Sequence, residues 1–220
     1  MNHLGWSRIF GLVIPYFIIV GVFQLIGASI AEIPLDNSSY EESTIQHVTM
    51  SFSSFLGTIF LIWLIMKFVD KEPFIEVGFH IKNRGKDILI GIFLGLIIMG
   101  VAYLGLSLFN QVIFDKLNFN FSELFYTTLI FIFVAILEEV LFRGYVLKNL
   151  MLSFNKYIAL FVSSILFSLM HGANPNISIF SLLGLFLAGM ALGATYIYTR
   201  NLWYPIAFHF SWNFFQSLLG

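Results

Sequence analysis

The residues that could do chemistry are polar side chains inside long apolar runs. Residues 135–144 read "AILEEVLFRG" and hold two adjacent carboxylates and one guanidinium. One such charge at the centre of a membrane helix costs about 2.5 to 3.5 kcal/mol, so each needs a partner. Glu139 and Arg143 are spaced i,i+4 and can form an ion pair on one helix face. Glu138 lies about 100° around the helix and is left over, as a candidate general base or as part of a structural polar cluster.

Two later apolar runs each carry a histidine in a helical pair. Phe167 and His171 are spaced i,i+4, and so are His209 and Asn213. Counted at about 1.5 Å per residue from the nearest basic residues, Glu138 and these polar groups lie about 13 to 22 Å into the membrane from the same side. One carboxylate, two histidines and an amide at comparable depth predict a water-filled catalytic cavity.

The composition predicts an integral membrane protein. The 220-residue chain is 59% hydrophobic and 10% charged, and its mean hydropathy is +0.89. These values lie outside the range of soluble globular proteins. We therefore expect most of its helices to be surrounded by the lipid bilayer and not by water.

Apolar runs long enough to cross a hydrocarbon core of about 30 Å predict an all-α, polytopic transmembrane helix bundle. The six long runs are Ile9–Ala31, Ser51–Val69, Ile88–Phe109, Leu124–Leu147, Ile177–Thr199 and Leu202–Leu219. A seventh run, 157–170, is shorter than the roughly 17 residues usually required, so about seven membrane helices are expected, within a range of six to eight. We expect a single membrane domain over 1–220, with variable helices in 1–122 and a catalytic helical core in 123–220.

Two sequence patterns predict how the helices are oriented and packed. On the expected spans, nine basic residues fall on one side and only Lys116 falls on the other; the nine are Arg8, Lys67, Lys71, Lys82, Arg84, Lys86, Lys148, Lys156 and Arg200. The positive-inside rule then places the amino terminus of this multi-pass protein in the cytoplasm, and a bacterial host implies the plasma membrane. The glycine pairs 91/95 and 189/193 are small-xxx-small patterns, which predict close helix packing.

Several function classes are disfavoured. The net charge is −1 and no run of like charges is present, so nucleic acid is not an expected partner. The chain has no cysteine, which excludes a thiol nucleophile and thiolate metal ligands. No G-x-S-x-G is present, and every aspartate falls in a loop or at the end of a span, which disfavours serine and aspartyl protease mechanisms.

Together the motifs resemble those of the CPBP family (CAAX protease and bacteriocin-processing, or Abi) of intramembrane glutamic endopeptidases. Its E-E-x-x-x-R, F-x-x-x-H and H-x-x-x-N motifs are matched, in order, by Glu138, Glu139 and Arg143, by Phe167 and His171, and by His209 and Asn213. The resemblance extends over about Leu124–Leu219. It implies a membrane-embedded endopeptidase that uses no cofactor and acts on a membrane-associated or lipidated peptide or protein.

The resemblance also implies roles for individual residues. Glu138 and His171 are expected to bind and deprotonate the attacking water, and His209 with Asn213 is expected to form the oxyanion hole. The supporting residues are Glu139, Arg143 and Phe167.

Two alternatives use the same residues. A zinc peptidase could take Glu138, His171 and His209 as ligands with water in the fourth position, although H-E-x-x-H is absent and the nearby Arg143 opposes cation binding. A non-proteolytic immunity or scaffold protein could bind a peptide or membrane partner through these helices. Binding alone, however, does not require both a base and an oxyanion pair.

Overall fold

The computed structural model describes residues 3–34, 40–114, 116 and 119–219 of the chain. Its α-helices are α1 (Leu4–Ile30), α2 (Thr44–Ile65), α3 (Gly85–Leu108), α4 (Phe121–Glu139), α5 (Lys148–Ser153), α6 (Lys156–Met170), α7 (Ile179–Thr199) and α8 (Trp203–Leu219). The described residues also form the 3₁₀- or π-helical turns η1 (Met66–Asp70), η2 (Phe74–Val77), η3 (Val140–Leu147) and η4 (His171–Ala173). No strand occurs in the described residues, which confirms the predicted all-α fold.

In the part of the chain that the structure describes, six helical segments are long and apolar enough to cross a membrane. They are Leu4–Ile30, Thr44–Asp70, Gly85–Leu108, Phe121–Ser153, Lys156–Ala173 and Ile179–Thr199. The short run at 157–170 is among them because η4 continues α6. The final helix α8, with 17 residues, is shorter than all six. The chain is thus an integral, multi-pass membrane protein within the predicted range of six to eight membrane helices.

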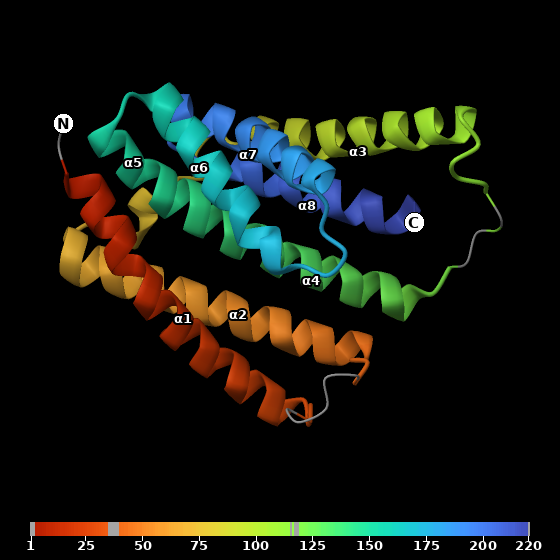
Figure 1. The fold of residues 1–220 in the computed structure, drawn as a ribbon, viewed down its shortest axis with the longest axis horizontal. Coiled ribbons are helices and arrows are strands. Elements are labelled where there is room, and N and C mark those ends of the chain that lie inside the picture. The colour runs from red at the N-terminus through yellow and green to blue at the C-terminus, as the bar shows by residue number, and fades with distance from the viewer. Residues whose placement is uncertain (1–2, 35–39, 115, 117–118, 220) are drawn as a thin grey trace.

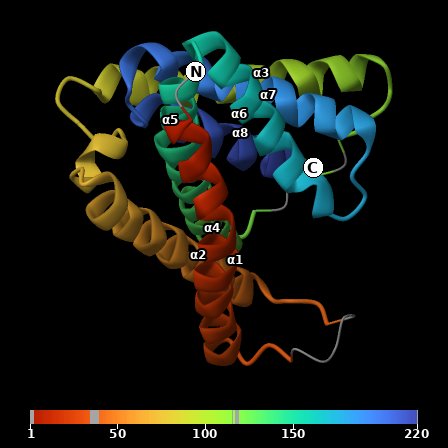
Figure 2. The same ribbon diagram turned by 60° about the vertical axis from the view of Figure 1, so that its left-hand side comes forward.

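The segment made of α4, η3 and α5 runs through the middle of the molecule, with α1 and α2 on one side and α3, α6, α7 and α8 on the other (Figure 1). α4 packs against both α2 and α8, while α1 pairs with α2, α3 with α8, and α6 with α7. Figure 2 shows that the C-terminal end of α1 and the N-terminal end of α2 project away from the remaining helices. α4 is therefore the element to which the two groups of helices attach.

Asparagine side chains fix where the site-bearing helices begin. Asn120 accepts hydrogen bonds from first-turn N–H groups of α4, and Asn155 does the same for α6. Asn201 accepts from the N–H of Trp203 at the start of α8 and donates to the carbonyl of His80, at 2.6 Å. Such caps satisfy backbone donors that no helix can satisfy internally. The depth of each helix is thus set by polar contacts at its first turn.

The helix that carries the adjacent carboxylates widens directly after them. α4 ends at Glu139 and continues as the π-helical turns of η3 before α5 begins. Such turns insert extra backbone into an α-helix and often occur at functional sites. All eight residues of η3 are buried.

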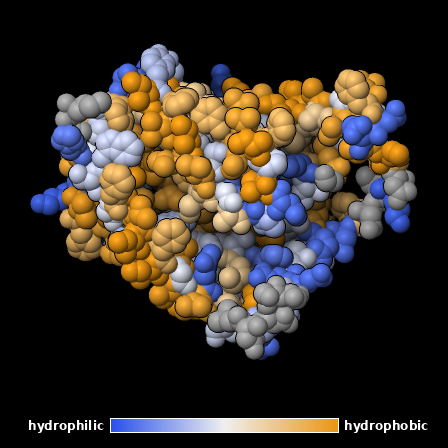
Figure 3. Space-filling view, viewed as in Figure 1, coloured by the Kyte–Doolittle hydropathy of each residue, from blue (hydrophilic) through white to orange (hydrophobic). Residues whose placement is uncertain are grey.

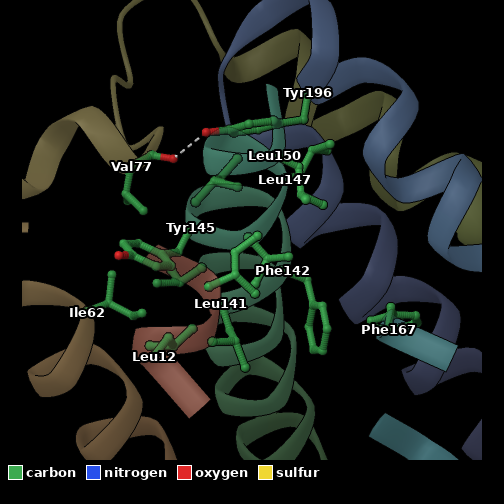
Figure 4. Packing of buried hydrophobic residues seen from close by; sticks show 14 of the residues in the cluster. Leu12, Ile62, Val77, Leu141, Phe142, Tyr145, Leu147, Leu150, Phe167 and Tyr196 are labelled. Atoms are coloured by element: carbon green, nitrogen blue, oxygen red, sulfur yellow. Dashed lines mark hydrogen bonds between the residues drawn. The ribbon is translucent and has the colours of Figure 1, made fainter. Parts of the chain in front are cut away.

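The hydrophobic core surrounds η3 and α5. Leu141, Phe142 and Leu147 pack in one cluster with residues from α1, α2 and α7 (Figure 4). In the same cluster the hydroxyl of Tyr196 donates to the carbonyl of Val77 at 3.0 Å. This tyrosine ties η2 to α7.

Both glycine pairs lie at helix contacts, as predicted. A Cβ atom at Gly91 would be 2.8 Å from the backbone nitrogen of Phe208, and one at Gly95 would be 2.5 Å from the hydroxyl of Ser211. A Cβ atom at Gly189 would meet Ser164 of α6 at 3.0 Å. Glycine is therefore required for the approach of α3 to α8 and of α7 to α6.

Candidate active site

The polar residues predicted from three separate helices line one cavity of about 470 Å³. Glu138 comes from α4, His171 from the end of α6, and His209 and Asn213 from α8. The remaining lining residues are Phe131, Val134, Phe167, Leu185, Ala188, Leu192, Trp212, Gln216 and Ser217. The cavity thus combines a few convergent polar groups with largely apolar walls, as ligand sites commonly do.

Both imidazole rings point at the same oxygen of Glu138. His171 Nε2 lies 3.7 Å from Glu138 Oε2, and His209 Nε2 lies 3.9 Å from it. These distances exceed a direct hydrogen bond. Glu138 Oε2 itself is buried and has no hydrogen-bond partner among the described residues. Such an atom is well placed to bind a polar ligand such as water.

The other nitrogen of each histidine is engaged in a way that assigns its proton. His171 Nδ1 lies 2.8 Å from the carbonyl oxygen of Phe167. A carbonyl only accepts, so Nδ1 carries the hydrogen and the neutral ring keeps its lone pair on Nε2. His209 Nδ1 lies 2.8 Å from Glu139 Oε1, and an ionised carboxylate again accepts. In both rings, Nε2 is the nitrogen available to the cavity.

Glu139 and Arg143 form the ion pair predicted from their spacing. Glu139 is fully buried, and its Oε1 accepts from Arg143 Nη1 at 2.8 Å. Arg143 Nη2 also donates to the carbonyl of Gly189 at 3.2 Å, and the guanidinium carbon lies 4.5 Å from the centre of the Phe167 ring. Glu139 therefore connects a buried cation to His209, and this chain of contacts fixes the orientation of the imidazole.

Phe167 fills the space behind the two histidines. Its ring centre lies 4.8 Å from that of His171 and 6.2 Å from that of His209. On its other side it packs edge-to-face against Phe142 of η3. The ring is 2% exposed, so it supports the histidines by packing.

Some cavity residues were not predicted. Trp212 and Gln216 share the face of α8 that presents Asn213, and helical spacing from the predicted pair could have identified them. The α7 residues Leu185, Ala188 and Leu192 carry no signal, because an apolar residue in an apolar helix is indistinguishable from one that faces lipid. Tyr16 and Asn174, which line a second cavity beside Glu138, were also missed.

The zinc alternative gains no geometric support. In the part of the chain that the structure describes, no group of three or more His, Cys, Asp or Glu side chains is arranged to hold a metal ion. Glu138, His171 and His209 therefore do not form a ready three-ligand set.

The fold and the cavity define a multi-pass membrane protein with a polar site among its helices. Residues 120–215 match the family model described as "Type II CAAX prenyl endopeptidase Rce1-like". The match over this region confirms the resemblance to CAAX proteases drawn from the motifs. No curated protein and no solved structure matched the chain.

The matched region contains the four polar residues of the cavity that the sequence predicted. It runs from the residue before α4 to the second half of α8 and so includes Glu138, His171, His209 and Asn213. The matched family is one of endopeptidases, and α1 to α3 lie outside the match.

Proposed function

We propose that the chain is an intramembrane glutamic endopeptidase that hydrolyses a peptide bond of a membrane-associated or lipidated peptide or protein. The observation that carries the proposal is that two imidazole Nε2 atoms lie 3.7 and 3.9 Å from the same carboxylate oxygen inside a membrane helix bundle. The family match supports the same reaction class.

Glu138 and His171 activate the attacking water. The carboxylate of Glu138 takes one proton, while the lone pair of His171 Nε2 accepts a hydrogen bond and directs the water oxygen. The resulting hydroxide adds to the scissile carbonyl carbon without an acyl-enzyme. When the carbon–nitrogen bond breaks, Glu138 returns its proton to the leaving amine, so the carboxylate base is regenerated.

His209 and Asn213 stabilise the oxyanion that forms on the carbonyl oxygen. The side-chain amide of Asn213 donates directly. Because His209 Nδ1–H already donates to Glu139, Nε2 donates only when the ring is an imidazolium. The buried carboxylate of Glu139 supports that cation, and one such donor is worth about 2.7 to 4 kcal/mol of barrier in other proteases.

The walls of the cavity indicate the class of substrate. Leu185, Ala188 and Leu192 of α7 line the cavity together with Phe131 and Val134 of α4. Such walls fit an apolar or lipid-modified chain better than a charged one. The family description, a prenyl endopeptidase, supports a lipidated carboxyl terminus as one substrate of this kind.

The reaction as proposed uses no metal and no cofactor, because the carboxylate of Glu138 takes and returns the proton and the imidazole of His171 directs the water. We also propose that the amino terminus lies in the cytoplasm. Arg8, Lys148 and Arg200 line one small cavity, so basic residues from three segments meet at the same end of the bundle.

The proposal is tested with purified protein in detergent and a library of membrane peptides. The Glu138→Ala variant should lose most cleavage and remain folded. Glu123→Ala is the matched control, because Glu123 is an exposed carboxylate in the first turn of the same helix. If Glu138→Ala cleaves as well as the parent, the assignment of Glu138 as the base is wrong. If the parent cleaves nothing but retains a membrane partner, the scaffold alternative is supported.

A further inference from the structure

A second cavity reaches the same two residues from a different side. It has a volume of about 240 Å³ and shares Glu138 and His171 with the larger cavity. The larger cavity is bounded by α7 and α8, whereas the second is bounded by Tyr16 of α1 and by Asn174 in the turn after η4. The base and its histidine partner therefore separate two cavities.

One lining residue of the second cavity lies at the protein surface. Asn174 is exposed, and it lies in the turn between η4 and α7. Because α6 is short, this turn lies near the middle of the long dimension of the molecule (Figure 1). In Figure 3, hydrophilic side chains gather around the position of this turn and toward the beginnings of α2 and α4, whereas much of the remaining face is apolar. The second cavity thus extends between Glu138 and a residue that is exposed at that surface.

A hydrolase whose substrate covers the catalytic base needs a separate path for the water that it consumes. A substrate that occupies the larger cavity lies against Phe131, Val134 and Leu185 and covers Glu138 from that side. Hydrolysis nevertheless consumes one water at Glu138 in every cycle. The second cavity has room for several waters, at about 30 Å³ each, and its polar groups include Tyr16 and Asn174.

We propose that the second cavity is the route by which the hydrolytic water reaches Glu138 and His171 while the substrate occupies the larger cavity. Tyr16 and Asn174 hydrogen-bond the waters that pass along it. The inference rests on the proposed function, since it assigns a path to the water of that reaction. It also makes α1, which lies outside the family match, part of the site.

The absence of cysteine from the chain allows a direct test of access. Single-cysteine variants Asn174→Cys, for the second cavity, and Ala188→Cys, for the larger one, are treated with a membrane-impermeant thiol reagent, with and without a non-cleavable analogue of a peptide that the parent cleaves. At about ten times its Kd, the analogue should slow labelling of Ala188→Cys about tenfold and leave Asn174→Cys unchanged. If the analogue slows labelling of both variants equally, the second cavity is not a separate route and the proposal is wrong.

Kinetics of the modified variants give the second readout. A bulky group attached to Asn174→Cys should lower kcat with little change in KM, because it obstructs water and not substrate. The same group on Ala188→Cys should raise KM. Each variant is compared with its own unmodified activity, and Ala173→Cys, in the same exposed turn but outside the cavity lining, is the control. A raised KM with unchanged kcat at position 174, or no effect there, overturns the route.

The two hypotheses fail in different ways. If the parent cleaves no peptide, the proposed function is refuted, whereas labelling in the absence of peptide still tests access. If the parent cleaves peptides but Asn174→Cys does not react with the reagent, the water route is refuted and the proposed function stands.

Discussion

The two adjacent carboxylates, Glu138 and Glu139, lie in very different surroundings. Glu139 is fully buried, and its Oε1 accepts from both Arg143 and His209. The Glu138 side chain is 19% exposed and borders two cavities. A rotation of about 100° between consecutive helix positions thus separates a closed network that holds geometry from an open site that can bind a ligand. The closed network also serves the open site, because Glu139 orients His209.

The largest expected effect comes from breaking the closed network. Arg143→Ala leaves the carboxylate of Glu139 buried without its cation, which should lower the free energy of unfolding by about 3 to 5 kcal/mol. The control is Arg84→Ala, which removes a partly exposed pair with Asp87 that is worth about 0 to 1 kcal/mol. Denaturant unfolding in one detergent compares the two. Equal losses would show that the buried pair does not stabilise the fold.

Removing an oxyanion donor should change chemistry and not stability. Asn213→Ala should lower kcat by about 10²- to 10³-fold with little change in KM, because the donor acts only as charge develops. Asn213 is only partly buried, so the unfolding midpoint should stay near that of the parent. Gln111→Ala, at an exposed amide beyond the end of α3, is the control. A rise in KM alone would assign Asn213 to substrate binding instead.

A smaller effect is expected where α8 is held in place. Gly95→Ala should destabilise the fold by about 1 to 3 kcal/mol, because its Cβ would meet Ser211 and the backbone of Trp212. Gly100→Ala in the same helix meets nothing within 4 Å, so it should be neutral or should stabilise by up to about 1 kcal/mol. Thermal unfolding distinguishes them, and the same sign for both variants would contradict the close contact between α3 and α8.

The smallest expected effect is that of a chelator. Cleavage should be unchanged after treatment with a zinc chelator, since Glu138 takes and returns the proton and His171 directs the water without a metal. Activity that disappears on chelation and returns with zinc would favour the metallopeptidase with the same residues as ligands.

The sequence predicted the parts of this arrangement that depend on local spacing. The ion pair between Glu139 and Arg143 follows from i,i+4 periodicity, and the shared depth of the polar groups follows from helix rise. The contact from His209 to Glu139 depends on how α8 packs against α4, 70 residues away, and no local rule specifies it. Tyr16 is one aromatic residue among many in an apolar helix, so its place beside Glu138 was equally hidden.

The central claim is that Glu138 is the base of the reaction, and the isosteric variant Glu138→Gln tests it most directly. The measurement is kcat for a cleaved peptide, made on variant and parent samples with matching unfolding midpoints. We expect kcat to fall by about 10²- to 10⁴-fold, because glutamine keeps the shape of the side chain but cannot accept the proton from water. A Glu138→Gln protein that is folded and cleaves the peptide at the rate of the parent would contradict the account.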